Sequence, residues 1–176
     1  RPAYVYPLFE QALRIKAGES PDEHRKRIGE LWSQFSDVAQ GNPYAWNRTP
    51  LTADQIWQSN EGNRMISWPY TKLMNSNNMV DQGAVVILAS AEKATHLQIP
   101  ADRWVFPHAG TDSHDTYAVG ERLELSDSPA IRIGGRRALE LAGAAIDDID
   151  LVDVYSCFPS AVQVAAAELG LPLGDA

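Results

Sequence analysis

Apolar residues recur at helical spacing between positions 21 and 40. They stand three or four residues apart: Ile28, Leu31, Trp32, Phe35, Val38 and Ala39. Such spacing predicts an amphipathic helix. Ser20-Pro21-Asp22-Glu23 supplies its start, because serine can accept from a free backbone N–H and Glu23 can return the bond. The pattern predicts a helix over 21–40 that Gly41 stops. We interpret Trp32 and Phe35 as a core-facing stripe rather than an aromatic ligand cradle.

The pattern changes after residue 63. Residues 42–63 are rich in proline, asparagine and glycine, and predict an irregular segment with one short helix after Thr52. Beyond them, continuous apolar runs predict strands near 84–90, 103–108 and 150–155. Capping serines, prolines and glycines predict helices near 129–142 and 160–169. Alternation of strand and helix is typical of an α/β fold with parallel pairing.

Composition and charge narrow the classes of function. The 176 residues suffice for one domain, and 44% hydrophobic with 22% charged residues is ordinary globular composition. Fifteen basic and 23 acidic residues give a net charge of −8, with no strongly basic stretch. We therefore expect neither a nucleic-acid-binding nor a membrane-surface protein. No apolar run reaches the roughly 18 residues that a membrane helix needs, and no signal peptide is evident.

The chain has a single cysteine, and this limits the kinds of covalent and metal cross-link it can form. It excludes an internal disulfide and a cysteine-based zinc site, which fits a reducing, cytoplasmic compartment.

The chain begins with Arg-Pro-Ala and ends with Gly-Asp-Ala, so we expect it to be a piece of a longer protein.

Cys157 stands at the predicted carboxyl end of the strand near 150–155. Open α/β sheets place their ligands at that end. Alternation along the strand puts Tyr155 on the same face as Cys157, and the helix that begins near Ser160 would favour a thiolate. Free cysteine is also a common buried filler. Both interpretations remain open at this point.

Two stretches around this cysteine resemble the thiolase superfamily. D-L-V-D-V-Y-S-C-F, residues 150–158, is similar to the strand that leads into Asn-Glu-Ala-Phe in thiolases and into His-Asp-Cys-Phe in their sterol-carrier-protein-2 type. N-S-N-N-M-V-D-Q-G-A-V-V-I-L-A-S, residues 75–90, resembles the stretch Asn-Ala-Ser-Gly-x-Asn-Asp-Gly-Ala-Ala and its following strand. The helix and the A-A-I-D-D-I-D linker before Leu151 are also similar. The resemblance covers 63–173 well and the earlier residues loosely, and is nearest to actinobacterial proteins of the acetyl-CoA acetyltransferase type.

The resemblance implies a thiolase-type α/β fold fragment, a parallel-rich sheet with helices, plus a helical loop region. Residues 1–80 would form the helical loop region of the amino-terminal thiolase half. Residues 81–100 would form the last strand of that half and a linker, and residues 101–176 the start of the carboxy-terminal half. The strands near 84–90 and 150–155 would then belong to different halves.

Site residues follow from the same resemblance. Tyr155 stands where thiolases place a donor to the thioester oxyanion, and Cys157 where the sterol-carrier type has a proposed acid/base. Ser156 departs from the family's acidic residue. The coenzyme A contacts fall on three successive loop residues: Asn78, Met79 and Val80. The alternative is that Asn75 to Asn78 form only a turn whose side chains cap its own backbone.

The implied activity belongs to the parent protein. It is acyl transfer on acyl-CoA thioesters, by Claisen condensation or thiolysis. The family's nucleophilic Cys-x-Ser and its Gly-His-Pro motif are not in this chain, so the chain alone is expected to be inactive. The alternatives are a thiolase-like retro-aldol lyase of steroid side-chain CoA esters and a non-catalytic acyl-CoA binder.

Partners and cofactors complete these expectations. We expect the ordered chain to contact the remainder of its parent or a homodimer mate, and a small OB-fold subunit or domain is a further candidate. Coenzyme A enters as a substrate thioester, and no separate cofactor is expected.

Four residues are numerous enough to form a metal site: His108, Asp112, His114 and Asp115. They lack a fixed spacing and thiolases use no metal, so no metal is expected. Gly134-Gly135 lacks a phosphate-loop pattern and indicates close helix packing.

Overall fold

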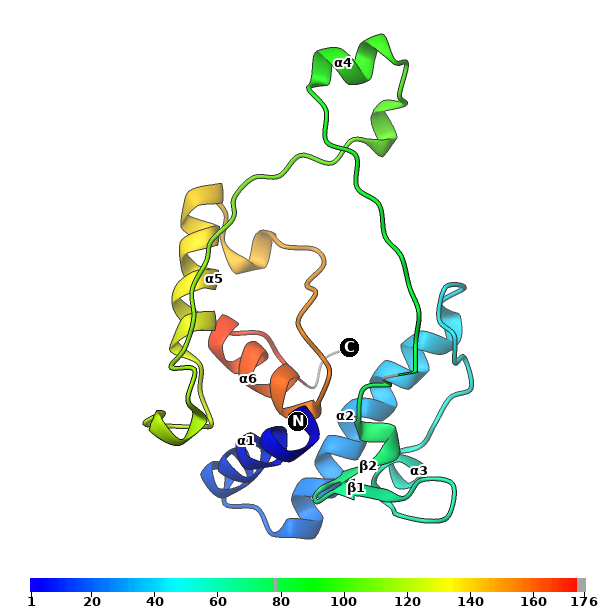
Figure 1. The fold of residues 1–176 in the computed structure, drawn as a ribbon, viewed down its shortest axis with the longest axis vertical. Coiled ribbons are helices and arrows are strands. Elements are labelled where there is room, and N and C mark those ends of the chain that lie inside the picture. The colour runs from blue at the N-terminus through cyan, green and yellow to red at the C-terminus, as the bar shows by residue number, and fades with distance from the viewer. Residues whose placement is uncertain (78, 174–176) are drawn as a thin grey trace.

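A computed structural model describes residues 1–77 and 79–173, and helices dominate it (Figure 1). The α-helices are α1 (Pro2–Ala17), α2 (Pro21–Gly41), α3 (Ala53–Trp57), α4 (Ala91–His96), α5 (Pro129–Ala142) and α6 (Pro159–Leu169). Four short 3-10 turns are η1 (Lys72–Met74), η2 (Ala101–Arg103), η3 (Val119–Glu121) and η4 (Ile146–Asp148). A small antiparallel hairpin pairs β1 (Met65–Ser67) with β2 (Tyr70–Thr71).

Local capping chemistry sets the ends of the predicted helices. The Ser20 hydroxyl accepts from the Glu23 N–H at 3.4 Å, and the Glu23 carboxylate accepts from the Ser20 N–H at 2.9 Å. Thr52 and Gln55 form the same reciprocal pair at the start of α3. Helices α5 and α6 end at glycines in the left-handed conformation, Gly143 and Gly170. The predicted helices at 21–40, 129–142 and 160–169, and the short helix after Thr52, are therefore confirmed.

The buried core gathers residues from distant parts of the chain. Its members come from α2, α3, β2, η1 and the start of α6: Ile28, Ile56, Tyr70, Met74 and Phe158. Trp32 packs against this core, but Phe35 is 49% exposed and Val38 is 66% exposed. The predicted core-facing stripe is thus correct for the first half of α2 and wrong for its second half.

The pair Gly134-Gly135 lies at a close helix contact, as predicted. A Cβ atom on Gly135 would collide with the Leu169 side chain of α6, and one on Gly134 would lie 2.7 Å from the Ser113 hydroxyl. Side-chain-free positions let α5 and α6 approach each other here. The packing holds the end of α6 against α5.

The three strands predicted from apolar runs are absent from the part of the chain that the structure describes. Residues 84–90, 103–108 and 150–155 form no ladder, and across 1–77 and 79–173 the sheet is two-stranded and antiparallel rather than parallel-rich. Long extended segments lead to and from α4 instead (Figure 1). Four consecutive residues there are 81% to 89% exposed: Val85, Val86, Ile87 and Leu88. A strand exists only by pairing, and the described residues place no free sheet edge beside these segments.

No helix among residues 1–77 and 79–173 combines the length and the apolar content needed to cross a bilayer.

The close contact between α2 and α3 gives a first testable prediction. A Cβ atom on Gly29 would lie 3.0 Å from the Ala53 carbonyl oxygen and 3.0 Å from the Trp57 Cβ. We therefore expect Gly29→Ala to lower the free energy of unfolding by about 1–3 kcal/mol, measured by urea denaturation. Gly41→Ala is the matched control on the same helix, because nothing lies within 4 Å of its Cβ position. Equal stability of the two variants would contradict this account of the contact.

Candidate functional site

The turn before α6 is anchored by an aromatic side chain. Phe158 is the N-cap residue of α6, and Pro159 occupies the first helical turn. The Phe158 ring stacks on Tyr6 of α1 at 4.4 Å between centroids and packs on Tyr70 of β2 at 5.3 Å. Phe158 is only 2% exposed. Three elements from distant parts of the chain therefore fix the backbone on which Cys157 sits.

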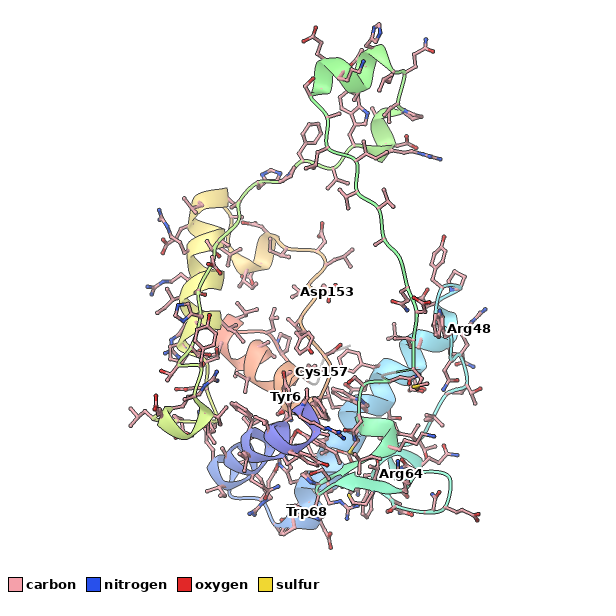
Figure 2. The ribbon with its side chains drawn as sticks, in the orientation of Figure 1. Tyr6, Arg48, Arg64, Trp68, Asp153 and Cys157 are labelled. Carbon is pink, nitrogen blue, oxygen red and sulfur yellow. The ribbon has the colours of Figure 1, made fainter. Side chains whose placement is uncertain are left out.

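Two phenols surround the Cys157 thiol. Cys157 is half-buried and packs against the hydrophobic core. The Tyr6 and Tyr155 side chains lie near this thiol, close enough that it influences the pKa of both phenols. Figure 2 shows Tyr6 and Cys157 close together at the start of α6. The chain thus assembles a thiol and two phenols from segments about 150 positions apart in the sequence.

The environment raises the pKa of both phenols. Burial, followed by the Cys157 hydrogen bond and charge, raises the pKa of Tyr6 well above its usual range. The hydrogen bond with Cys157, followed by its charge and by burial, raises the pKa of Tyr155. Both side chains are therefore protonated at neutral pH and act as hydrogen-bond donors.

The two segments with thiolase-like sequences meet at this turn. The Ser76 N–H, in the stretch 75–90, donates to the Cys157 carbonyl oxygen, in the stretch 150–158, at 3.1 Å. The Asn75 side chain donates to the Thr71 carbonyl at 2.7 Å and holds the loop to β2. The sequence motifs are separated by about 60 residues, yet the fold places them in direct contact.

The predicted coenzyme A contacts lie in the same loop. Met79 and Val80 are exposed to solvent, and Asn78 lies outside the described residues. The Asn77 side-chain oxygen accepts from the Met79 N–H at 3.0 Å. This local bond is what the alternative interpretation, a turn capped by its own side chains, requires at Asn77. Ligand contact by Met79 and Val80 stays a prediction.

A cavity of about 540 Å³ opens beside the two phenols, between α1, α5 and α6. Most of its lining is apolar: Val5, Phe9, Val119, Ile131, Val154, Ala161, Val164, Ala165 and Leu169. Tyr6 and Tyr155 also line it, and Tyr155 is 70% exposed. The volume lies within the range of small-molecule sites. The two tyrosines therefore line the cavity and adjoin Cys157.

The rim of the cavity is polar. Asp115 accepts from the Ser128 hydroxyl at 2.5 Å and from the Ala130 N–H at 3.0 Å, so it caps the start of α5. Arg122 lies 3.7 Å from Asp115 and places its guanidinium 5.4 Å from the centre of the Phe9 ring. His114 stacks on Tyr117 at 5.1 Å. Asp115 and His114, two of the four residues that suggested a metal in the sequence, thus have other structural contacts.

Sequence reasoning identified Cys157 and Tyr155 but missed Tyr6. Tyr6 lies in α1, which has no capping side chain at its start and contains Pro7, so Pro2 alone marks where that helix begins. Nothing in the residues around Tyr6 distinguishes it from an ordinary packing tyrosine. Its role depends on the packing of α1 against α6.

Known proteins resemble the chain in sequence and in structure. No family model matches the chain. The chain is 29% identical over 132 residues, 75% of its length, to an acetyl-CoA acetyltransferase of Methanothermobacter thermautotrophicus. A crystal structure of a monomeric SCP2-thiolase-like protein, type 1, from Mycobacterium smegmatis superposes on 99% of the chain with a TM-score of 0.89 and 34% identity. The predicted resemblance to the thiolase superfamily is confirmed.

These thiolase-like relatives are longer than the chain. The chain spans 32% of the acetyltransferase and 38% of the solved thiolase-like protein. The structural match covers nearly the whole chain, so it includes the extended segments around α4. The thiolase-like neighbour supports the α/β class of the prediction, although the described residues carry only the β1–β2 hairpin.

Proposed function

We propose that this chain is part of a thiolase-like acyltransferase that acts on acyl-CoA thioesters. The observation that carries the proposal is the 3.1 Å hydrogen bond between the Ser76 N–H and the Cys157 carbonyl. It joins the two segments that resemble thiolases, and a thiol, two phenols and an apolar cavity adjoin that point. The names of the relatives agree with this class of reaction.

In this proposal Cys157 moves the proton of the carbon–carbon bond-forming step. The Cys157 thiolate would take the proton from the carbon next to the thioester carbonyl and become a thiol. The C–H bonding pair would pass into an enolate whose negative charge rests on the thioester oxygen. The enolate carbon would then attack an acyl group held as a thioester on a second cysteine, which the complete protein must supply. The new carbon–carbon bond forms as the acyl carbon–sulfur bond breaks, and the second cysteine leaves as a thiolate.

Tyr155 would stabilise the enolate oxygen. A protonated phenol aimed at the site of developing charge is a donor of the oxyanion-hole type. The raised pKa of Tyr155 keeps its proton in place at neutral pH. The phenol is longer than the asparagine of typical thiolases, so the oxygen it binds would lie farther from the backbone of the Cys157 turn. The exposed Met79 and Val80, with Asn78, would contact the coenzyme A moiety.

The protonated phenols favour acyl transfer over the retro-aldol alternative. Retro-aldol cleavage needs a base that removes a hydroxyl proton, and a tyrosine base would have to be a phenolate. The raised pKa values of Tyr6 and Tyr155 disfavour that form. A non-catalytic acyl-CoA binder would give no chemical role to the Cys157 thiol, which lies beside two protonated phenols.

The exposed extended segments point to further polypeptide in the working protein. Residues such as Val85, Val105 and Leu151 are at least 88% exposed. Unpaired apolar strands of this kind are completed by pairing or covering. We propose that the remainder of the parent protein, or a homodimer mate, supplies that pairing. A small OB-fold partner and a cytoplasmic location remain part of the same proposal.

The test is ligand protection of Cys157 in the complete protein. We expect iodoacetamide to label the Cys157 peptide, followed by mass spectrometry, and acetyl-CoA at saturating concentration to slow that labelling at least about tenfold. Coenzyme A without an acyl group is the matched ligand control, and it should protect less. Equal labelling with and without acetyl-CoA would show that the thioester does not reach Cys157 and would overturn the proposal.

A further inference from the structure

A buried charged network lies beneath the Cys157 turn, and the proposed reaction does not use it. Glu10 of α1 and His24 of α2 are both 0% exposed, and the Glu10 Oε1 lies 2.6 Å from the His24 Nε2. The second ring nitrogen, Nδ1, lies 2.6 Å from the Glu19 Oε2. Arg27 binds Glu19 through its Nε at 2.6 Å. Burying charges is costly unless they are paired and hydrogen-bonded.

The donors around Glu10 favour an ionised carboxylate. Three donors converge on the Glu10 carboxylate: the His24 ring, the Gln163 amide at 2.7 Å and the Tyr70 hydroxyl at 2.6 Å. Burial, followed by the charge of Glu10 and its hydrogen bond, raises the pKa of Tyr70 far above its usual range, so the Tyr70 hydroxyl is a donor. An ionised Glu10 carboxylate accepts from all three, and the proton between Oε1 and Nε2 then lies on the His24 ring.

The contact at the Nδ1 side of the His24 ring also favours a protonated nitrogen. Burial raises the pKa of Glu19, but the hydrogen bonds and charges of Arg27 and His24 outweigh it, and the net pKa is lowered. Glu19 is thus ionised, and the short contact at Nδ1 requires a second ring proton. The Arg27 Nη2 also lies 3.1 Å from Nδ1. It lies there because it donates to the Glu19 Oε2, also at 3.1 Å, and this is the oxygen that the ring binds at the shorter distance. With Glu10 ionised, His24 is an imidazolium, and the two cations His24 and Arg27 balance the two carboxylates Glu10 and Glu19.

The network reaches the Cys157 turn along two routes. Gln163 of α6 bridges Glu10 and Arg27, with its oxygen 2.9 Å from the Arg27 Nη1. The Tyr70 hydroxyl lies 2.9 Å from the Ser160 hydroxyl in the first turn of α6, and the Tyr70 ring packs on Phe158. Both routes end within six residues of Cys157. The charges of α1 and α2 are therefore tied to the start of α6.

We propose that Glu10 is a positioning residue that, through its ion pair with the His24 imidazolium, sets the position of the turn that carries Cys157. Glu10 does not reach the reacting atoms. It holds Tyr70 and Gln163, and these hold the start of α6. The effect on turnover rests on the proposed function, whereas the effect on the turn itself does not.

Glu10→Gln in the complete protein tests this inference. Glutamine keeps the size of the side chain, and its amide oxygen can still accept from the His24 Nε2–H. It removes the carboxylate charge that balances the buried imidazolium, and we therefore expect the ring to release one proton. We expect the ring ¹⁵N resonances of His24 to show both nitrogens protonated in the wild type and only one in the variant. We also expect alkylation of Cys157 by iodoacetamide, without ligand, to become about tenfold faster as the half-buried sulfur is released. Glu30→Gln, at an exposed site of α2, is the matched control and should change neither measurement.

A milder variant serves if Glu10→Gln does not fold. Tyr70→Phe keeps the ring against Phe158 and removes only the hydroxyl that links Glu10 to Ser160, and we expect alkylation to become about threefold faster. One protonated ring nitrogen on His24 in the wild type would overturn the inference. So would an unchanged alkylation rate in both variants. Failure of acetyl-CoA to protect Cys157, with the expected changes in Glu10→Gln, would overturn the proposed function alone.

Discussion

Phe158→Ala is expected to lower the free energy of unfolding by about 3–5 kcal/mol, because it removes a large buried ring and leaves a cavity. Phe158 is 2% exposed and lies between the Tyr6 and Tyr70 rings, at 4.4 Å and 5.3 Å between centroids. Removing it takes a large apolar side chain from the core and leaves a cavity where α1, β2 and α6 meet. Chemical denaturation of the complete protein, read by circular dichroism, measures the change.

Phe158→Leu is the control for this prediction. Leucine keeps most of the volume and loses the ring stacking, so we expect a cost below about 1.5 kcal/mol. Equal costs for the two variants would mean that aromatic contact rather than the cavity dominates. A cost below about 1 kcal/mol for Phe158→Ala would mean that the turn before α6 is not held by this packing.

Helices were the part of this fold that the sequence could predict. Their starts and ends depend on residues that are neighbours in the chain, such as Ser20 with Glu23 and Thr52 with Gln55. Capping bonds of this kind form in the same way whatever the rest of the protein does. Helix α1 had no specific prediction because no capping side chain precedes it and Pro7 interrupts its pattern.

Strands were not predictable in the same sense. The apolar run from Val85 to Leu88 indicates that these residues require burial, but not which segment will cover them. A ladder needs a second edge, and its partner can be far away in the sequence or outside it. The described chain leaves these residues extended and exposed, and the predicted parallel sheet is missing from it.

In the candidate site, too, the sequence could point to residues of one short motif but not to residues that only packing brings together. Cys157 and Tyr155 belong to one short motif, so sequence resemblance could point to both. Tyr6 reaches the same thiol only through the packing of α1 against α6. The partners of Glu10 are His24, Tyr70 and Gln163, which stand 14, 60 and 153 residues away. A buried ion pair of such separation leaves no periodic pattern, and its residues look like ordinary surface charges.

Cys157→Ala in the complete protein is expected to reduce acyl transfer between acetyl-CoA molecules by about 10²–10⁴-fold in kcat, the usual contribution of a positioned acid/base. Alanine removes the group that takes the α-proton and leaves the turn in place, since Phe158, Ser76 and Ser160 hold it through other contacts. The KM for acetyl-CoA should change little, because the cavity lining and the loop near Met79 are untouched.

Tyr155→Phe separates the two roles in that step. It removes the hydroxyl that would donate to the enolate oxygen but keeps the ring at the cavity, so we expect a loss of about 10²–10³-fold in kcat with Cys157 still open to alkylation. Steady-state rates of the wild type and both variants decide the matter. If Cys157→Ala turns over acetyl-CoA at the wild-type rate, the thiol moves no proton. Cys157 is then a small core residue, half-buried against Phe158 and its neighbours, and the acid/base must come from another part of the complete protein.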